Sequence, residues 1–179
     1  RSNKISQLEY LAERQKALFS GLDCTIEQSG FYPPWEFNDN SKLKEIYKEF
    51  GFYKEGLLSL TKKGISGSEE IKNMMVRFRN TPPKQILGSD IIKIKDYKSS
   101  ISKNVRSGEE STINLPKSDV LQFFTEDGTK ISIRPSGTEP KIKFYFGIKA
   151  NLNDIADFEV VNNELNERIG KLTKLFSEE

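Results

Sequence analysis

The stretch ISIRPSGTEPKIKFYF, residues 131–146, holds two apolar strand patterns separated by one polar bend. Apolar and polar residues alternate on both sides of the bend, which predicts β-strands over 129–135 and 141–149. The bend itself contains a glycine, two prolines and two hydroxyl side chains, all typical of tight turns. These features together predict two neighbouring antiparallel strands joined by a short, stiff connection.

Working outward, the sequence predicts two more strands, over 90–97 and 119–127, with a hairpin turn at Glu126-Asp127-Gly128. A helix is expected after Ser68, with the apolar stripe Ile71, Met74, Met75 and Phe78. A long amphipathic helix is expected over 157–176, and no regular element over 98–118. From residue 66 onward the chain thus predicts an α+β unit, a four-stranded antiparallel sheet with helices on one face.

The first third of the chain predicts a different kind of segment. It reads as a helix over 5–19, a short strand over 23–28 and a loop over 29–41 that is dense in aromatic residues. A further helix over 41–53 should end at Gly51, and the polar stretch 59–67 is expected to be a hinge or linker. The expected division is a helical and loop fragment over 1–40, a connecting segment over 41–65 and the α+β domain over 66–179.

Composition excludes several functions. The 28 basic and 26 acidic residues leave a net charge of +2, which gives no footprint for nucleic acid. Apolar runs are too short to span a bilayer, and the single Cys24 suits a reducing, cytoplasmic environment. The absence of histidine removes the commonest general base and zinc ligand. Because the chain begins at Arg1 rather than at methionine, we expect a piece of a longer protein.

The bend has the composition of a phosphate site. The guanidinium of Arg134 can donate two parallel hydrogen bonds to one phosphate, and Ser136 and Thr138 each offer a hydroxyl and a backbone N–H. Gly137 can adopt positive φ and lets a ligand approach the backbone. Lys141 and Lys143 keep the neighbourhood positive, whereas the carboxylate of Glu139 should point away from an anion. The alternative from the same residues is an ordinary turn.

The segment RPSGTEPKIKFY resembles the phosphate-binding loop in the last domain of the α-D-phosphohexomutases, the phosphoglucomutase/phosphomannomutase family. The resemblance extends over about residues 41–179. It implies a domain of the TATA-box-binding-protein-like type that binds a hexose phosphate or inorganic phosphate. By position it implies that the phosphate is bound by Arg134, Ser136, Gly137 and Thr138, with Lys141 in a supporting role.

Other parts of that family's machinery are not found in the sequence. There is no phosphoserine loop of the T-A-S-H-N-P type, no D-x-D-x-D-R magnesium loop and no G-E-x-S-G sugar loop in the expected context. The resemblance therefore implies that Mg²⁺ belongs to the full-length enzyme, through mutase domains outside this chain. We expect no cofactor, no metal site and no catalytic residue here, and no isomerase activity from this chain alone.

Residues 1–41 resemble another group, the aminoacyl-histidine dipeptidases, whose lid carries a YPGWEPNxDS-like loop where this chain has YPPWEFNDNS. This resemblance implies a junction of two unrelated pieces near residue 41. The other interpretation is a divergent fragment of the mutase third domain. A second function class also stays open, a non-catalytic protein-interaction module in which the phosphate loop is vestigial.

Overall fold

The computed structural model describes residues 40–62, 64 and 66–178. The predicted helix 5–19, the strand 23–28 and nearly all of the aromatic loop lie outside the described residues, and with them the resemblance to dipeptidases. The chain divides into two units, which we call the small unit (described residues 40–53 and 150–164) and the sheet unit (54–149 and 165–178). The expected boundaries at residues 40 and 65 stay predictions.

The small unit is built on an aromatic stack. Helix α2 (Asn40–Phe50) ends at Gly51, as predicted, because this glycine has φ 96° and its N–H donates to the carbonyl of Tyr47 over 2.9 Å. The ring of Phe52 then stacks on Tyr47, with centroids 4.2 Å apart, and on Phe158, with centroids 4.9 Å apart. A short helix, η1 (Ile155–Asp157), precedes Phe158.

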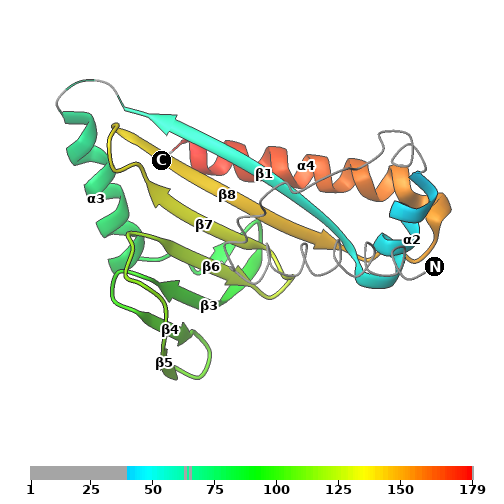
Figure 1. Ribbon diagram of the computed structural model, residues 1–179, viewed down its shortest axis with the longest axis horizontal. Helices are drawn as coiled ribbons and strands as arrows, with labels where there is room; N and C mark the ends of the chain where they lie inside the picture. Colours follow the sequence, from blue (N-terminus) through cyan, green and yellow to red (C-terminus); the bar gives the residue numbers. More distant parts are fainter. Residues whose placement is uncertain (1–39, 63, 65, 179) are drawn as a thin grey trace, which may run out of the picture. The chain divides into compact units, whose positions relative to one another are not determined.

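The sheet unit is dominated by one antiparallel sheet, shown in Figure 1. Its strands are β1 (Phe52–Thr61), β2 (Gln85–Ile86), β3 (Ser89–Asp96), β4 (Ile101–Asn104), β5 (Glu110–Thr112), β6 (Leu121–Thr125), β7 (Lys130–Pro135) and β8 (Lys141–Ala150). The spatial order is β1-β8-β7-β6-β3-β4-β5, and β2 pairs with β3. The four predicted strands are the present β3, β6, β7 and β8, and they form the middle of this sheet.

The core lies on one face of the sheet, which we call the helix face. Leu121, Ile133 and Phe144 stand opposite one another on β6, β7 and β8 and are almost fully buried. Directly opposed residues project to the same side of an antiparallel pair, so this row and the next one, Phe123–Ile131–Phe146, form a continuous apolar layer. The apolar residues of the alternating sequence pattern therefore point into the core, and the residues between them point to the opposite side of the sheet.

Both long helices cover this helix face, as predicted. Helix α3 (Ser66–Asn80) contributes Phe78, and helix α4 (Phe158–Ser177) contributes Phe176. The ring of Phe144 lies 6.2 Å from Phe78 and 5.0 Å from Phe176, and the two helical rings lie 6.2 Å from each other. Aromatic packing of this kind fixes both helices to one layer of the sheet.

The sheet is larger than the sequence predicted. The strand β1 was not predicted, and the stretch 98–118, expected to lack regular structure, contains the β4–β5 hairpin. All three residues of β5 are exposed, so the hairpin carries no apolar alternation from which it could be recognised. Helix α3 also begins at Ser66, so Ser68, after which the helix was expected to start, lies inside it.

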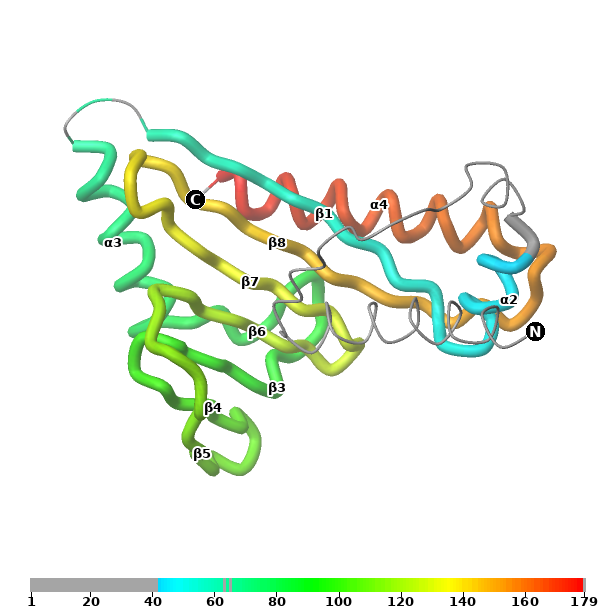
Figure 2. The backbone as a smooth tube through the Cα atoms, viewed as in Figure 1, coloured from blue at the N-terminus to red at the C-terminus, as the bar shows by residue number. Residues whose placement is uncertain are grey.

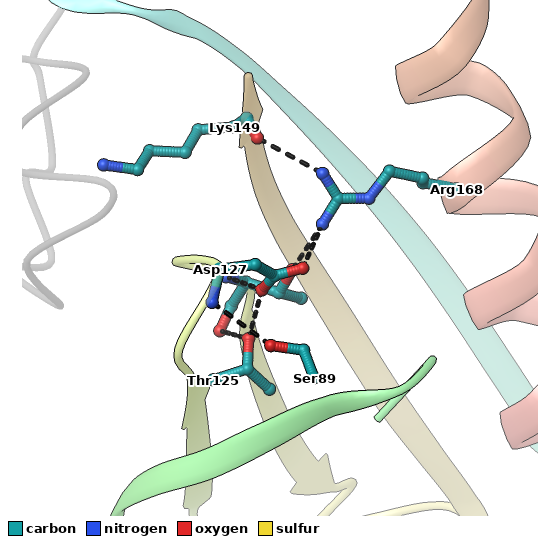
Figure 3. A network of polar contacts seen from close by, with 6 residues as sticks. Ser89, Thr125, Asp127, Lys149 and Arg168 are labelled. Atoms are coloured by element: carbon teal, nitrogen blue, oxygen red, sulfur yellow. Dashed lines mark hydrogen bonds and ion pairs between the residues drawn. The ribbon is translucent and has the colours of Figure 1, made fainter. Parts of the chain in front are cut away.

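A polar network joins α4 to the predicted turn between β6 and β7 (Figure 3). Arg168 Nη2 donates to Asp127 Oδ2 over 2.5 Å and to Thr129 Oγ1 over 3.0 Å, and Nη1 donates to the carbonyl of Lys149 over 3.3 Å. Gly128 takes φ 82° in this turn, so the hairpin forms where the sequence predicted it. The network lies at the start of β7, whereas the bend at 136–140 follows its other end.

Candidate functional site

The bend over 136–140 is closed by its own backbone. The N–H of Ser136 donates to the carbonyl of Lys141 over 2.7 Å, and the N–H of Lys141 donates to the carbonyl of Glu139 over 2.7 Å. The carbonyl of Pro140 accepts from the N–H of Lys62, just after β1, over 2.9 Å. Figure 2 shows the bend beside the end of β1 and the start of α3. The bend is therefore fixed both by hydrogen bonds within it and by one from the residue after β1.

The start of α3 approaches this region closely. A Cβ added to Gly67 would lie 2.7 Å from the carbonyl oxygen of Lys62, too near for any other residue without a backbone shift. Gly67 thus allows the first turn of α3 to pack against the residue that holds Pro140. The sequence predicted a hinge over 59–67 but gave no sign that a glycine is required at position 67.

Glu139, the acidic residue of the bend, is neutralised locally. Its Oε2 lies 3.0 Å from the Nζ of Lys141. The hydrogen bond and charge of Lys141 hold the pKa of Glu139 below its ordinary value, with a smaller contribution from Lys143. Lys141, predicted to support the site, therefore acts first as the partner of Glu139.

Arg134 has a second cation directly beside it. The register of β7 and β8 pairs Arg134 with Lys143, so the two side chains project from the same side of the sheet. Neither makes an ion pair or hydrogen bond with a described residue. Like charges placed directly opposite each other are destabilising in a sheet. From the sequence, Lys143 was expected only to keep the neighbourhood positive, because the register of two strands cannot be predicted from each strand alone.

The bend also presents backbone donors. Gly137, Thr138 and Glu139 are exposed, and their N–H groups donate to no described residue. The N–H of Ser136 is already used within the bend, so only the hydroxyl of Ser136 is left for a ligand. Successive N–H groups of this kind can surround an anion.

Gly137 differs from the prediction made for it. It does not have positive φ, and a Cβ built on it would meet no atom within 4 Å. Neither backbone strain nor crowding therefore requires a glycine at this position. The open space above it is the space through which a ligand would reach the N–H groups.

Two further features concern metal binding and membrane association. No group of three His, Cys, Asp or Glu side chains that could hold a metal ion occurs in the part of the chain that the structure describes. The residues present there do not fit a Mg²⁺ site, and no chemistry is assigned to one. No helix within residues 40–178 is long and apolar enough to cross a membrane.

Comparisons with known proteins agree with this reading of the fold. The family described as "Phosphoglucomutase/phosphomannomutase, C-terminal domain" matches residues 37–160. A phosphoglucomutase of Staphylococcus saprophyticus is 37% identical over 125 residues, which is 68% of this chain and 22% of that protein. A phosphoglucomutase of Staphylococcus aureus strain MSSA476 is 39% identical over 116 residues, 64% of this chain and 21% of that protein.

Among solved structures, the open form of the Paramecium exocytosis-sensitive phosphoprotein pp63/parafusin covers 75% of this chain and 22% of its own, with 13% identity and a TM-score of 0.36. The matched region thus spans about a fifth of the length of these relatives. The antiparallel sheet, its helix face and the match over residues 37–160 place this chain in the phosphoglucomutase/phosphomannomutase family, as a C-terminal domain.

Proposed function

We propose that the sheet unit binds the phosphate group of a hexose phosphate, as the C-terminal domain of a phosphohexomutase that interconverts hexose 1-phosphate and hexose 6-phosphate. The observation that carries this proposal is the cross-strand pair of Arg134 and Lys143 beside a bend with three available N–H groups. Two cations held opposite each other without an ion pair to a described residue are stabilised when an anion lies between them.

The charge of the site suits a phosphate monoester. Arg134, Lys141 and Lys143 are positive and Glu139 is negative, which leaves a net charge of +2. A phosphate monoester carries about −1.5 to −2 near neutral pH. Arg134 supplies the bidentate donor, Ser136 and Thr138 supply hydroxyls, and the backbone at Gly137 and Thr138 supplies N–H groups.

In this proposal the chain binds phosphate but has no catalytic centre of its own. The transfer of a phosphoryl group needs an aligned nucleophile and a metal ion. Neither a phosphoserine loop nor a magnesium loop of the family type is found in the sequence. Those parts are proposed to lie in other domains of a longer protein, and the purified 179-residue chain is expected to show no mutase turnover.

The test is a titration of the ¹⁵N-labelled chain with inorganic phosphate and with glucose 1-phosphate, followed by amide NMR. Saturable shifts centred on residues 134–138 are expected, with glucose alone producing none. Arg134→Ala should abolish the shifts, and Lys171→Ala, which removes an exposed charge from α4, should leave them unchanged. Silence of these amides in the wild type at millimolar ligand would overturn the proposal.

A further inference from the structure

The side of the sheet opposite the helix face, which we call the open face, has an unusual charge. Its central rows follow from the register of β3, β6, β7 and β8. These rows are Lys93–Phe124–Lys130–Gly147, Lys95–Gln122–Ser132–Tyr145 and Arg134–Lys143. Of these ten residues five are basic and none is acidic, whereas the whole chain is nearly balanced; Lys130 is buried and also interacts with Glu55 of β1, so the exposed positive charge comes from the other four.

Cations elsewhere in the sheet unit are commonly paired. Arg79 contacts Asp96 and Asp119, and Arg168 contacts Asp127. Lys93 and Lys95, by contrast, form no ion pair with a described carboxylate. The sheet unit therefore separates its charges, with paired cations around the edges and a concentration of positive charge on the open face.

The lysines of this face also influence one another. Lys95 and Lys130 both lie over the ring of Phe124, with Nζ 5.5 Å and 6.0 Å from its centroid. Partial burial and the charge of Lys93 lower the pKa of Lys95. Burial and the charge of Lys95 lower the pKa of Lys130, which Glu55 of β1 partly offsets. Lys95 of β3 and Lys130 of β7 thus lie close enough across Phe124 for their charges to interact.

We propose that the open face is an electrostatic surface which attracts phosphate monoester dianions to the bend at 136–140, with Lys93 and Lys95 acting at a distance rather than as ligands. This inference rests on the proposed phosphate site. It adds that affinity for the phosphate depends on residues of β3, two strands away from Arg134 in the sheet.

The distances suit this role. From strand spacing and rise, Lys95 lies about 12 Å and Lys93 about 17 Å from Arg134, measured between Cα atoms. These distances exceed a hydrogen bond by far, yet they are within the Debye length at about 0.02 M salt and well beyond the 3 Å Debye length at about 1 M. The attraction should therefore be present at low salt and disappear at high salt.

Phe124, one of the two aromatic residues in these rows, does not suit a nucleic-acid base. The side chain of Phe124 is only partly exposed and has two lysine ammonium groups close to its ring, so it is not a free stacking platform. The bend at the end of the surface has three neighbouring N–H groups available to one anion, which favours a small phosphate ester as the ligand.

The experiment is the same amide titration with glucose 1-phosphate, at ionic strengths fixed at about 0.02 M and about 1 M. At low salt, Lys93→Gln/Lys95→Gln should raise Kd about two- to threefold, and the Glu/Glu double variant about sixfold, because the interaction scales with the charge removed. At high salt both variants should bind as the wild type does. Lys93→Arg/Lys95→Arg, which keeps the charge, should match the wild type at either salt concentration.

The matched control is Lys84→Gln/Lys149→Gln. It removes the same charge from exposed positions at the opposite end of the sheet, about 20 Å from Arg134 by strand spacing and rise, and should change Kd less at low salt than Lys93→Gln/Lys95→Gln does. Unchanged affinity of the Gln/Gln and Glu/Glu variants at low salt, with normal wild-type binding, would overturn this inference and leave the phosphate site standing. A loss that persists at high salt would also overturn it, because it would indicate direct contact. Absence of wild-type binding would refute both.

Discussion

Arg168 in α4 donates from Nη2 to Oδ2 of Asp127 in the β6–β7 turn, across 2.5 Å and 41 residues of sequence. The same guanidinium reaches Thr129 and the carbonyl of Lys149. This one side chain thus connects the second half of α4 to the β6–β7 turn and to the end of β8.

Replacing Arg168 should weaken this tie. Both partners are more than a quarter exposed, so solvent reduces the contribution of the ion pair, and Arg168→Ala is expected to lower the free energy of unfolding by about 1–2 kcal/mol. Arg168→Lys keeps the charge but loses the two guanidinium nitrogens that donate to separate partners, so its stability should lie between those of the wild type and Arg168→Ala. Urea unfolding measures both, and an Ala variant as stable as the wild type would contradict the expected role.

The same network predicts a dependence of stability on pH. Burial alone would raise the pKa of Asp127, but the hydrogen bonds from Thr125 and Thr129 and the charge of Arg168 outweigh it, and the pKa is lowered. A carboxyl whose folded pKa is depressed contributes stability above its unfolded pKa of about 3.9 and loses it as pH falls through the folded value.

Stability should therefore decline on acidification below about pH 4–5. Asp127→Asn should be less stable at pH 7 and should have a shallower decline in acid. Urea midpoints collected between neutral and acidic pH test this. Parallel curves for the wild type and Asp127→Asn would assign the acid sensitivity to other carboxyls.

The two glycines at opposite ends of β7 should respond differently to alanine. Gly128 has φ 82°, so Gly128→Ala should cost about 1–2 kcal/mol of stability without changing phosphate binding. Gly137 has no positive φ and open space around its Cβ position, so Gly137→Ala should change stability by less than about 0.5 kcal/mol.

Gly137→Ala should nevertheless weaken phosphate binding, because its methyl group would occupy the space in front of the N–H groups. Thermal unfolding and the amide titration together separate the two effects. A Gly137→Ala protein that binds phosphate normally would mean that the anion approaches the bend from another side.

A buried chain of polar groups on the open face gives another prediction. The hydroxyl of Tyr97 donates to Gln122 Oε1 over 3.0 Å, and Gln122 Nε2 donates to Ser132 Oγ over 3.0 Å. Gln122 is only 7% exposed, so its amide oxygen needs a hydrogen-bond donor. Tyr97→Phe removes that donor and should lower the free energy of unfolding by about 1–2 kcal/mol.

The coupling between Tyr97 and Gln122 can be measured by a double-mutant cycle with Gln122→Leu. We expect the double variant to be less destabilised than the sum of the single variants, by about 0.5–1.5 kcal/mol. Additive free energies of unfolding would mean that the two side chains do not depend on each other.

The sequence carried enough information for the centre of the sheet, because residues such as Ile131, Ile133 and Phe144 alternate with polar ones and the alternation is a direct sign of one buried face. The turn at Asp127-Gly128 was equally readable, since its glycine meets a definite conformational need. The pattern of α4 was clear for the same reason, with Leu165, Leu172 and Phe176 buried at helical spacing.

Other features depend on contacts distant in sequence and were not readable. The partner of Arg134 across the strands is set by the register of β7 and β8, not by the composition of the bend. The proximity of Lys62 to Pro140 depends on β1, a strand whose polar end looked like a linker. The phosphate-site residues could be proposed from the resemblance, but how the bend is held could not.

The exposed hairpin of β4 and β5 is expected to protect the protein against self-association. An unpaired strand edge can recruit a second chain through its free N–H and C=O groups. Here β3, which contains Ile91, Ile92 and Ile94, is covered by β4, and the outermost strand is only three residues long with Glu110 paired to Lys103. Removing residues 101–112 is expected to turn β3 into an aggregation-prone edge, so this polar hairpin covers an apolar strand although its own residues are mostly exposed.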